Sequence, residues 1–96
     1  MYLEIITPEI SLFEGEVSSV TFPGANGSFQ VLKDHAPVIS MLDSGKIKIR
    51  LADNSRTLDA ASGRVVLDTS DDKTYFVELK SGVVEMRNNN IIVLVD

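Results

Sequence analysis

The clearest pattern in the chain is an unbroken alternation of apolar and polar residues over 46–51. It predicts a β-strand with Ile47, Ile49 and Leu51 facing a core and basic residues facing outward. Similar short apolar runs recur along the chain, and turn-forming residues separate them. We interpret as strands, besides 46–51, the runs 3–6, 17–22, 29–32, 38–42, 57–61, 65–67, 75–79, 83–86 and 91–95. Ten short strands at this spacing predict an all-β fold, an antiparallel sandwich or barrel.

The segment 7–16 is the one place where a helix competes with a strand. Thr7 is suited to cap a helix that has Pro8 at its first position. Its apolar residues fit a strand almost as well, and Gly15 interrupts a helix, so we predict β-structure. No linker or repeat divides the chain, which we expect to form a single domain over residues 1–96.

A predicted hairpin tip at 23–28 stands out from this framework. Asn26 and Gly27 are a strong hairpin signal, because both tolerate the positive φ of tight primed turns. Pro23 cannot donate a ladder hydrogen bond and therefore marks a strand end or an edge. We expect the tip to project from the β framework, with His35, Ala36 and Pro37 closing the next turn.

The composition of the chain argues against several classes of binding partner and of reaction. The net charge of −5 argues against a nucleic-acid binder, which needs a basic face. The chain has no cysteine, so disulfides and thiolate chemistry are excluded. The longest apolar run, 91–95, is far shorter than the roughly 20 residues that span a bilayer, so we expect no direct lipid insertion. The N-terminus lacks the features of a signal peptide.

The candidate chemical residues do not converge on a catalytic site. His35 is the only histidine, and we interpret it as a turn or interface residue. The acidic group Asp68, Asp71 and Asp72 lacks the spacing of a calcium loop, which indicates a solvated hairpin loop. The glycines of 24–27 are followed by no helix, so a turn fits better than a phosphate site. We therefore expect no enzyme activity, no cofactor and no metal.

A basic stripe runs along the outer face of the strand 46–51. It is either a solvated face that protects an edge or a surface that pairs with an acidic partner. On the residues alone, the chain is a small acidic all-β module that serves protein interaction. The stripe consists of Lys46, Lys48 and Arg50.

The order of several motifs resembles a known family. The chain is similar to the N-terminal β-sandwich of the epsilon subunit of F-type ATP synthases, called delta in mitochondria. The resemblance covers essentially the whole chain, and it rests on the order and spacing of its motifs. They are Phe13-Glu14-Gly15, Gly24-Ala25-Asn26-Gly27, His35-Ala36-Pro37, Gly45-Lys46-Ile47-Lys48-Ile49, Gly82-Val83-Val84-Glu85-Met86 and a last apolar strand that ends at Asp96.

The resemblance implies a ten-stranded antiparallel sandwich that acts as a non-catalytic rotor subunit. Such a subunit links gamma to the membrane c-ring at the cytoplasmic face of the bacterial inner membrane and couples proton flow to ATP synthesis. By resemblance, the c-ring contact is Gly24, Ala25, Asn26, Gly27 and Ser28. The gamma contact is His35, Ala36, Pro37, Val38, Ile39 and Met41, with the last three expected to share one face.

The chain departs from the family pattern at several positions, and the loop 69–73 looks longer than in many relatives. Ser28 stands where relatives often carry an acid, so we expect shape and backbone contacts to dominate over charge at the tip. Lys33 and Asp34 replace a common Pro-Gly or Pro-Asn. After the Asp96 position most relatives continue into a helical hairpin that inhibits ATP hydrolysis and in some members binds ATP. We expect this polypeptide neither to inhibit by helix insertion nor to hold its own ATP site.

Two other functions remain open from the residues. A free-standing module that binds a peptide or carbohydrate is the alternative. Carbohydrate binders usually expose aromatic side chains, but the chain has no tryptophan and only four phenylalanines and two tyrosines. Four of these aromatics lie in strands that we expect to be mostly buried: Phe22, Phe29, Tyr75 and Phe76. An enzyme would need a cluster of acid, base and nucleophile that the sequence does not show.

Overall fold

The computed structural model describes residues 1–58 and 63–96, and for 53–58 the course of the backbone alone. All regular structure in these residues is β-strand, which confirms the predicted fold class, although the described residues form nine strands and not ten. The strands are β1 (Tyr2–Ile6), β2 (Ser11–Gly24), β3 (Gly27–Leu32), β4 (Val38–Leu42), β5 (Gly45–Leu58), β6 (Val65–Leu67), β7 (Thr74–Leu79), β8 (Gly82–Arg87) and β9 (Asn90–Val95).

The lower strand count arises in β5. The predicted turn at 53–55 lies inside this 14-residue strand, and the predicted strand 57–61 is not separate: 57 and 58 end β5. Residues 59–61 lie outside the described part of the chain. Asp, Asn and Ser favour turns by composition, but main-chain pairing of Arg56 and Leu58 with Gly15 and Phe13 in β2 keeps the backbone extended.

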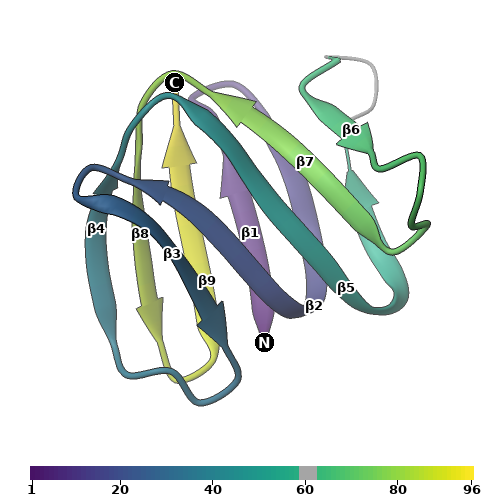
Figure 1. Cartoon of the computed structure of the whole chain (residues 1–96), viewed down its shortest axis with the longest axis horizontal. Helices are drawn as coiled ribbons and strands as arrows, with labels where there is room; N and C mark the ends of the chain where they lie inside the picture. Colours follow the sequence, from purple (N-terminus) through teal and green to yellow (C-terminus); the bar gives the residue numbers. More distant parts are fainter. Residues whose placement is uncertain (59–62) are drawn as a thin grey trace.

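The strands form two layers that cross each other (Figure 1). The front layer contains β3, the second half of β2, β5, β7 and β6, and the back layer contains β4, β8, β9 and β1. β2 passes from one layer to the other, since its first half pairs with β1 and its second half pairs with β3. The register between β2 and β5 shifts on both sides of Val17, as expected where a strand bends from one layer to the next.

One strand pair is parallel, contrary to the expected fully antiparallel sandwich. β9 forms a hairpin with β8, which fixes its direction, and it then lies parallel to β1 from Tyr2 beside Asn90 to Ile6 beside Leu94. The first and last strands of the chain are therefore neighbours in the back layer. The sheet is therefore mixed: the hairpin with β8 makes β9 antiparallel to β8, and in that direction β9 runs parallel to β1.

The core lies between the two layers and consists of the inward positions of the alternating strands. The prediction for 46–51 is confirmed, because Ile47, Ile49 and Leu51 are buried whereas the basic residues between them are exposed. The largest fully buried side chains are Phe13, Phe22, Leu3, Ile5, Leu12, Ile47, Ile49, Met86 and Ile91.

Thr7 closes the connection between β1 and β2 and starts no helix. Its Oγ1 accepts hydrogen bonds from the backbone N–H groups of Glu9 (3.2 Å) and Ile10 (3.0 Å). The hydroxyl of Thr7, which suggested a helix cap, thus accepts hydrogen bonds from the backbone N–H groups of a tight loop, as it would at the start of a helix. The β interpretation of this segment is confirmed, and the helix alternative is wrong.

Candidate interaction surfaces

The predicted hairpin tip is present, with a turn that differs from the expected one. Gly24 pairs with Gly27, so Ala25 and Asn26 form the two-residue turn between β2 and β3. Only Gly27 has positive φ, at 118°, and Asn26 does not. A turn followed by a glycine with positive φ is a common alternative to the primed turn in hairpins. The residues 25–28 are exposed.

The base of the tip is held against β4 and the turn that follows it. The N–H of Ala25 donates to the carbonyl oxygen of Met41 at 3.0 Å, and the N–H of Asp43 donates to that of Pro23 at 2.8 Å. Gly24 also pairs with Leu42. The tip is therefore joined by its main chain to a second loop, which gives a glycine-containing hairpin a fixed base.

Aromatic packing also supports the base of the tip. The rings of Phe22 and Phe29 lie 5.4 Å apart between centroids. A Cβ on Gly24 would lie 2.8 Å from the Phe29 ring and 2.6 Å from the carbonyl oxygen of Gly27. Glycine is required here because its missing side chain lets the ring and the opposite strand approach.

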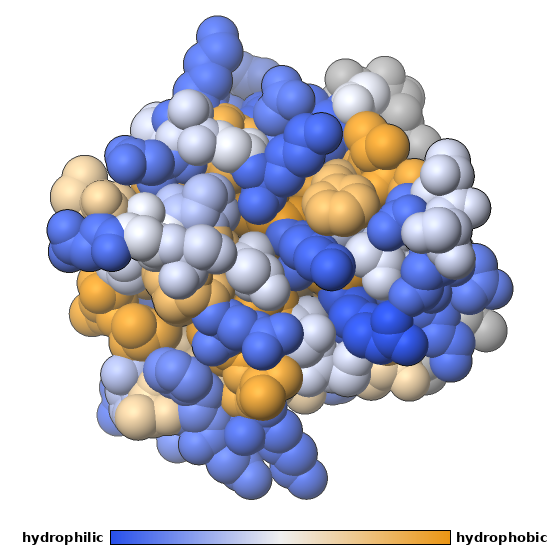
Figure 2. All heavy atoms as spheres, in the orientation of Figure 1, coloured by the Kyte–Doolittle hydropathy of each residue, from blue (hydrophilic) through white to orange (hydrophobic). Residues whose placement is uncertain are grey.

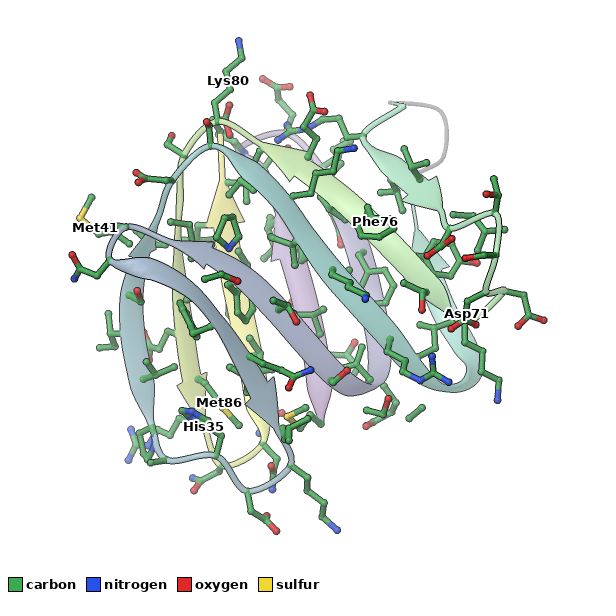
Figure 3. The ribbon with its side chains drawn as sticks, in the orientation of Figure 1. His35, Met41, Asp71, Phe76, Lys80 and Met86 are labelled. Atoms are coloured by element: carbon green, nitrogen blue, oxygen red, sulfur yellow. The ribbon has the colours of Figure 1, made fainter. Side chains whose placement is uncertain are left out.

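The His35 turn lies at the other end of the molecule from Met41 (Figure 3). Its position is fixed by a two-way hydrogen bond between loops 55 residues apart in sequence. Asn89 Oδ1 accepts from the Asp34 N–H at 2.7 Å, and Asn89 Nδ2 donates to Asp34 Oδ1 at 2.9 Å. His35 itself is exposed, and its Nδ1 lies 2.7 Å from the Ala36 carbonyl oxygen. This geometry matches a turn histidine.

The expected gamma-side residues of β4 do not all share one face. Ile39 and Met41 point outward and are 74% and 69% exposed, whereas Val38 packs against the core. Grouping Val38 with the other two was wrong, because side chains alternate along a strand and Val38 is an odd number of residues from both Ile39 and Met41. Val38 lies one residue from Ile39, so it points to the opposite side.

Sequence reasoning missed the rest of this surface. In the back layer, Met41 lies beside Val83 and Val83 beside Leu94, while Glu85 separates Ile39 from Ile92. The members of this group are all outward-facing and 39–74% exposed, and we call them the apolar face: Ile39, Met41, Val83, Ile92 and Leu94.

An acidic border adjoins the apolar face on β1 and β2. Ile92 lies beside Glu4, and Glu4 beside Glu14. The hydrogen bond between Tyr2 and Glu14 raises the pKa of the Tyr2 hydroxyl to about 12, with smaller contributions from desolvation and from the charges of Glu14, Glu4 and Glu16. A partner that covers this side of the molecule would meet apolar groups first and carboxylates at one edge.

The outer side of the front layer is mostly hydrophilic (Figure 2). The basic stripe lies here, and one of its members is engaged: Arg50 forms an ion pair with Asp71. A hollow of about 330 Å³ lies beside the stripe and is lined in part by Lys46, Val66 and Phe76. Phe76 is half-buried, as is Phe29, while Phe22 and Tyr75 are buried as expected.

The acidic segment after β6 is a hydrogen-bonded loop. Asp68 accepts from the N–H and hydroxyl of Ser70, and Asp71 accepts from the N–H of Lys73 and the hydroxyl of Thr74. These bonds hold the pKa of both carboxyls below the usual value. Across residues 1–58 and 63–96, no group of three or more His, Cys, Asp or Glu residues is placed to hold a metal ion.

Among the described residues, no helix is long and apolar enough to cross a membrane.

Comparison with known proteins gives one consistent result. A family model described as the β-sandwich domain of the ATP synthase delta/epsilon chain matches residues 1–63. The ATP synthase epsilon chain of Chlorobaculum tepidum is 50% identical over 62 residues, which cover 64% of this chain and 70% of that protein. That of Chlorobium limicola is 49% identical over 53 residues, covering 55% of this chain and 60% of the relative. That of a Sulfurovum species is 46% identical over 69 residues, covering 71% and 54%.

A solved structure shares the fold over nearly the whole chain. It is the cryo-EM structure of the central stalk and c-ring of the Tetrahymena thermophila mitochondrial ATP synthase. The TM-score is 0.67 at 17% identity, and the match covers 99% of this chain and 62% of the matched chain. The chain spans 54 to 70% of the length of the three curated relatives described above.

Proposed function

Because the chain belongs to the ATP synthase delta/epsilon chain β-sandwich family, we propose that it is a central-stalk subunit of an F-type ATP synthase. In this role it links the gamma subunit to the membrane c-ring and couples proton flow to ATP synthesis, while other subunits carry the chemistry. It lies at the cytoplasmic face of the bacterial inner membrane, held there through the complex. The names of the relatives and the central-stalk neighbour support this role.

The observation that carries the gamma side of the proposal is the apolar face. Five outward side chains of three adjacent strands lie around Glu85 and form a group that no part of the described chain covers. Contiguous apolar surface on a soluble domain marks an interaction site. The gamma subunit covers this face, and the acidic border meets polar or basic groups at its rim. Among the residues assigned to gamma by resemblance, Ile39 and Met41 make this contact directly.

The tip at 24–28 makes the c-ring contact. It projects from the end of the molecule at which Met41 lies, away from the His35 turn (Figure 3). The two contacts belong to one sandwich whose layers share a continuous core. A packed core deforms little, so a force applied at the tip reaches the apolar face without loss through a hinge.

Replacement of Met41 by Glu tests the gamma contact. We expect Met41→Glu to weaken binding of purified gamma from the same organism at least about tenfold, because it buries an unpaired carboxylate in an apolar interface. The fold should be kept, since Met41 is 69% exposed. Binding is measured by titration calorimetry, and folding by circular dichroism.

Val66→Glu is the matched control. Val66 is also an exposed apolar strand residue, 53% exposed, but it lies on β6 in the front layer. Binding of gamma by this variant should equal that of the wild type. Equal losses in both variants would contradict the assignment of gamma to the apolar face. Val38 is a poor test position because its substitution would disturb the core.

A further inference from the structure

Two loops form the end of the molecule that carries the tip. The first is the tip itself, and the second is the short turn at Asp43 and Ser44 between β4 and β5. The hydrogen bonds Ala25 N–H to Met41 and Asp43 N–H to Pro23 join them in both directions. Their packing is close as well: a Cβ on Gly45 would lie 3.1 Å from Cβ of Pro23. The two loops therefore move as one unit.

The charges at this end are uneven. The tip residues 24–28 carry no charge. Asp96 also lies at this end, but its Oδ1 accepts from the N–H groups of Lys80 and Ser81 and it pairs with Arg64. The carboxylate of Asp43 is exposed, and within the described residues it has no hydrogen-bond or ion-pair partner. It is the acid on the two-loop unit that is available to a partner.

We propose that the membrane-ring contact is a two-loop surface, the tip at 24–28 together with the Asp43–Ser44 turn, and that Asp43 supplies the carboxylate with which it meets a cationic loop. The inference rests on the proposed function, and it adds a residue and a partner chemistry to it. The tip contributes shape and backbone groups, and Asp43 contributes the charge that Ser28 lacks. Exposed complementary charges at a contact act on encounter and orientation and are sensitive to salt.

The joining of the loops is tested on the free chain by amide hydrogen exchange. Ala25 occupies the first turn position, where proline is favoured, so Ala25→Pro keeps the turn and removes the N–H that binds Met41. We expect the Asp43 amide to exchange slowly in the wild type and in the control Ala25→Ser, and at least about tenfold faster in Ala25→Pro. Equal exchange in all three proteins would overturn the two-loop unit.

The charge is tested with the chain bound to gamma. Binding of this complex to vesicles that carry the membrane sector of the same enzyme is measured at low and at high salt. Asp43→Asn should weaken binding about three- to tenfold at low salt, and the difference should vanish near 1 M salt. Asp72→Asn, an exposed acid on the loop between β6 and β7, should bind as the wild type does.

A double variant separates charge from local damage. If one unit presents the charge, Asp43→Asn with Ser28→Glu should recover part of the lost affinity, because the carboxylate returns on the neighbouring loop. Asp43→Asn that binds as well as Asp72→Asn would overturn the role of Asp43 and leave the proposed function standing. A wild-type complex that fails to bind the vesicles at any salt concentration would refute the proposed function itself.

Discussion

At the scale of single residues, hydrogen bonds to carboxylates decide which protonation states the fold favours. Tyr2 and Glu14 are diagonal neighbours on the paired strands β1 and β2. The hydrogen bond to Glu14 raises the pKa of the Tyr2 hydroxyl from 10.0 to about 12. The native state thus favours the neutral hydroxyl. Its contribution to stability is fully present below pH 10 and is lost as the pH rises through the interval from about 10 to 12.

We therefore expect the Tyr2 ring to titrate near pH 12, and near pH 10 in Glu14→Ala, because that variant removes both the hydrogen bond and the nearest charge. The chemical shift of the ring carbon that bears the hydroxyl, followed by NMR, reports this midpoint. Glu85→Ala is the control, since Glu85 is an exposed acid of β8 that makes no contribution at Tyr2. A midpoint near 10 in the wild type would show that the Tyr2–Glu14 bond is not formed.

The sequence could predict local turns at the scale of single residues, but it could not predict contacts between distant residues. Gly27 and the His35 turn were predictable because local turn chemistry depends on neighbouring residues. The bond between Asp34 and Asn89 was not, because 55 residues separate the partners and only the fold brings them together. Asp34 also adopts positive φ, at 64°, at the position where the family pattern expected from the sequence has glycine or asparagine, both of which tolerate this region.

At the scale of elements, the residues of β9 face two different environments. Ile91 is 1% exposed in the core, and its neighbour Ile92 is 47% exposed on the apolar face. From the sequence alone, the continuous apolar run 91–95 indicates burial on both sides, as in a strand covered by two layers. The outer side of the strand 46–51 was easier to predict, because polar residues alternate with apolar ones and mark the side that faces solvent. The apolar face was missed for this reason.

The same strand gives a matched pair of substitutions. Ile91→Ala should destabilise the fold by about 2–5 kcal/mol, because it leaves a cavity in the core. Ile92→Ala should cost less than about 1 kcal/mol in stability and should instead weaken gamma binding. Urea unfolding measures the first effect and calorimetry with gamma the second. Similar losses of stability in both variants would show that the register of β9 is wrong.

At the scale of the whole molecule, the two outer sides differ in character. The back layer presents the apolar face with an acidic border, and the front layer presents the basic stripe beside uncharged residues of β2 and β3. Exposed cations nevertheless occur on both sides, since Arg87 of β8 points outward beside Ile39 and Ile92 of the apolar face.

The arrangement of the layers also makes the whole fold depend on β9. Without residues 90–96, both β1 and β8 are left without a partner strand on one side. The core also loses three buried side chains, those of Ile91, Val93 and Val95. Each buried side chain contributes about 1.5–3 kcal/mol, against a total stability of about 5–15 kcal/mol for a small domain. We expect the truncated chain to be unfolded at 25 °C, as judged by collapsed amide dispersion in NMR spectra. Removal of Asp96 alone is the control and should keep the spectrum dispersed.

The parallel pairing of β1 with β9 has a consequence for synthesis. β1 is synthesised long before its partner β9, so the back layer cannot close until residue 95 has emerged from the ribosome. Contacts that span nearly the whole chain slow folding, because a long loop must be ordered before they form. Until then the open edges of β1 and β8 are exposed to other nascent chains. The sandwich therefore cannot complete its fold until β9 has left the ribosome.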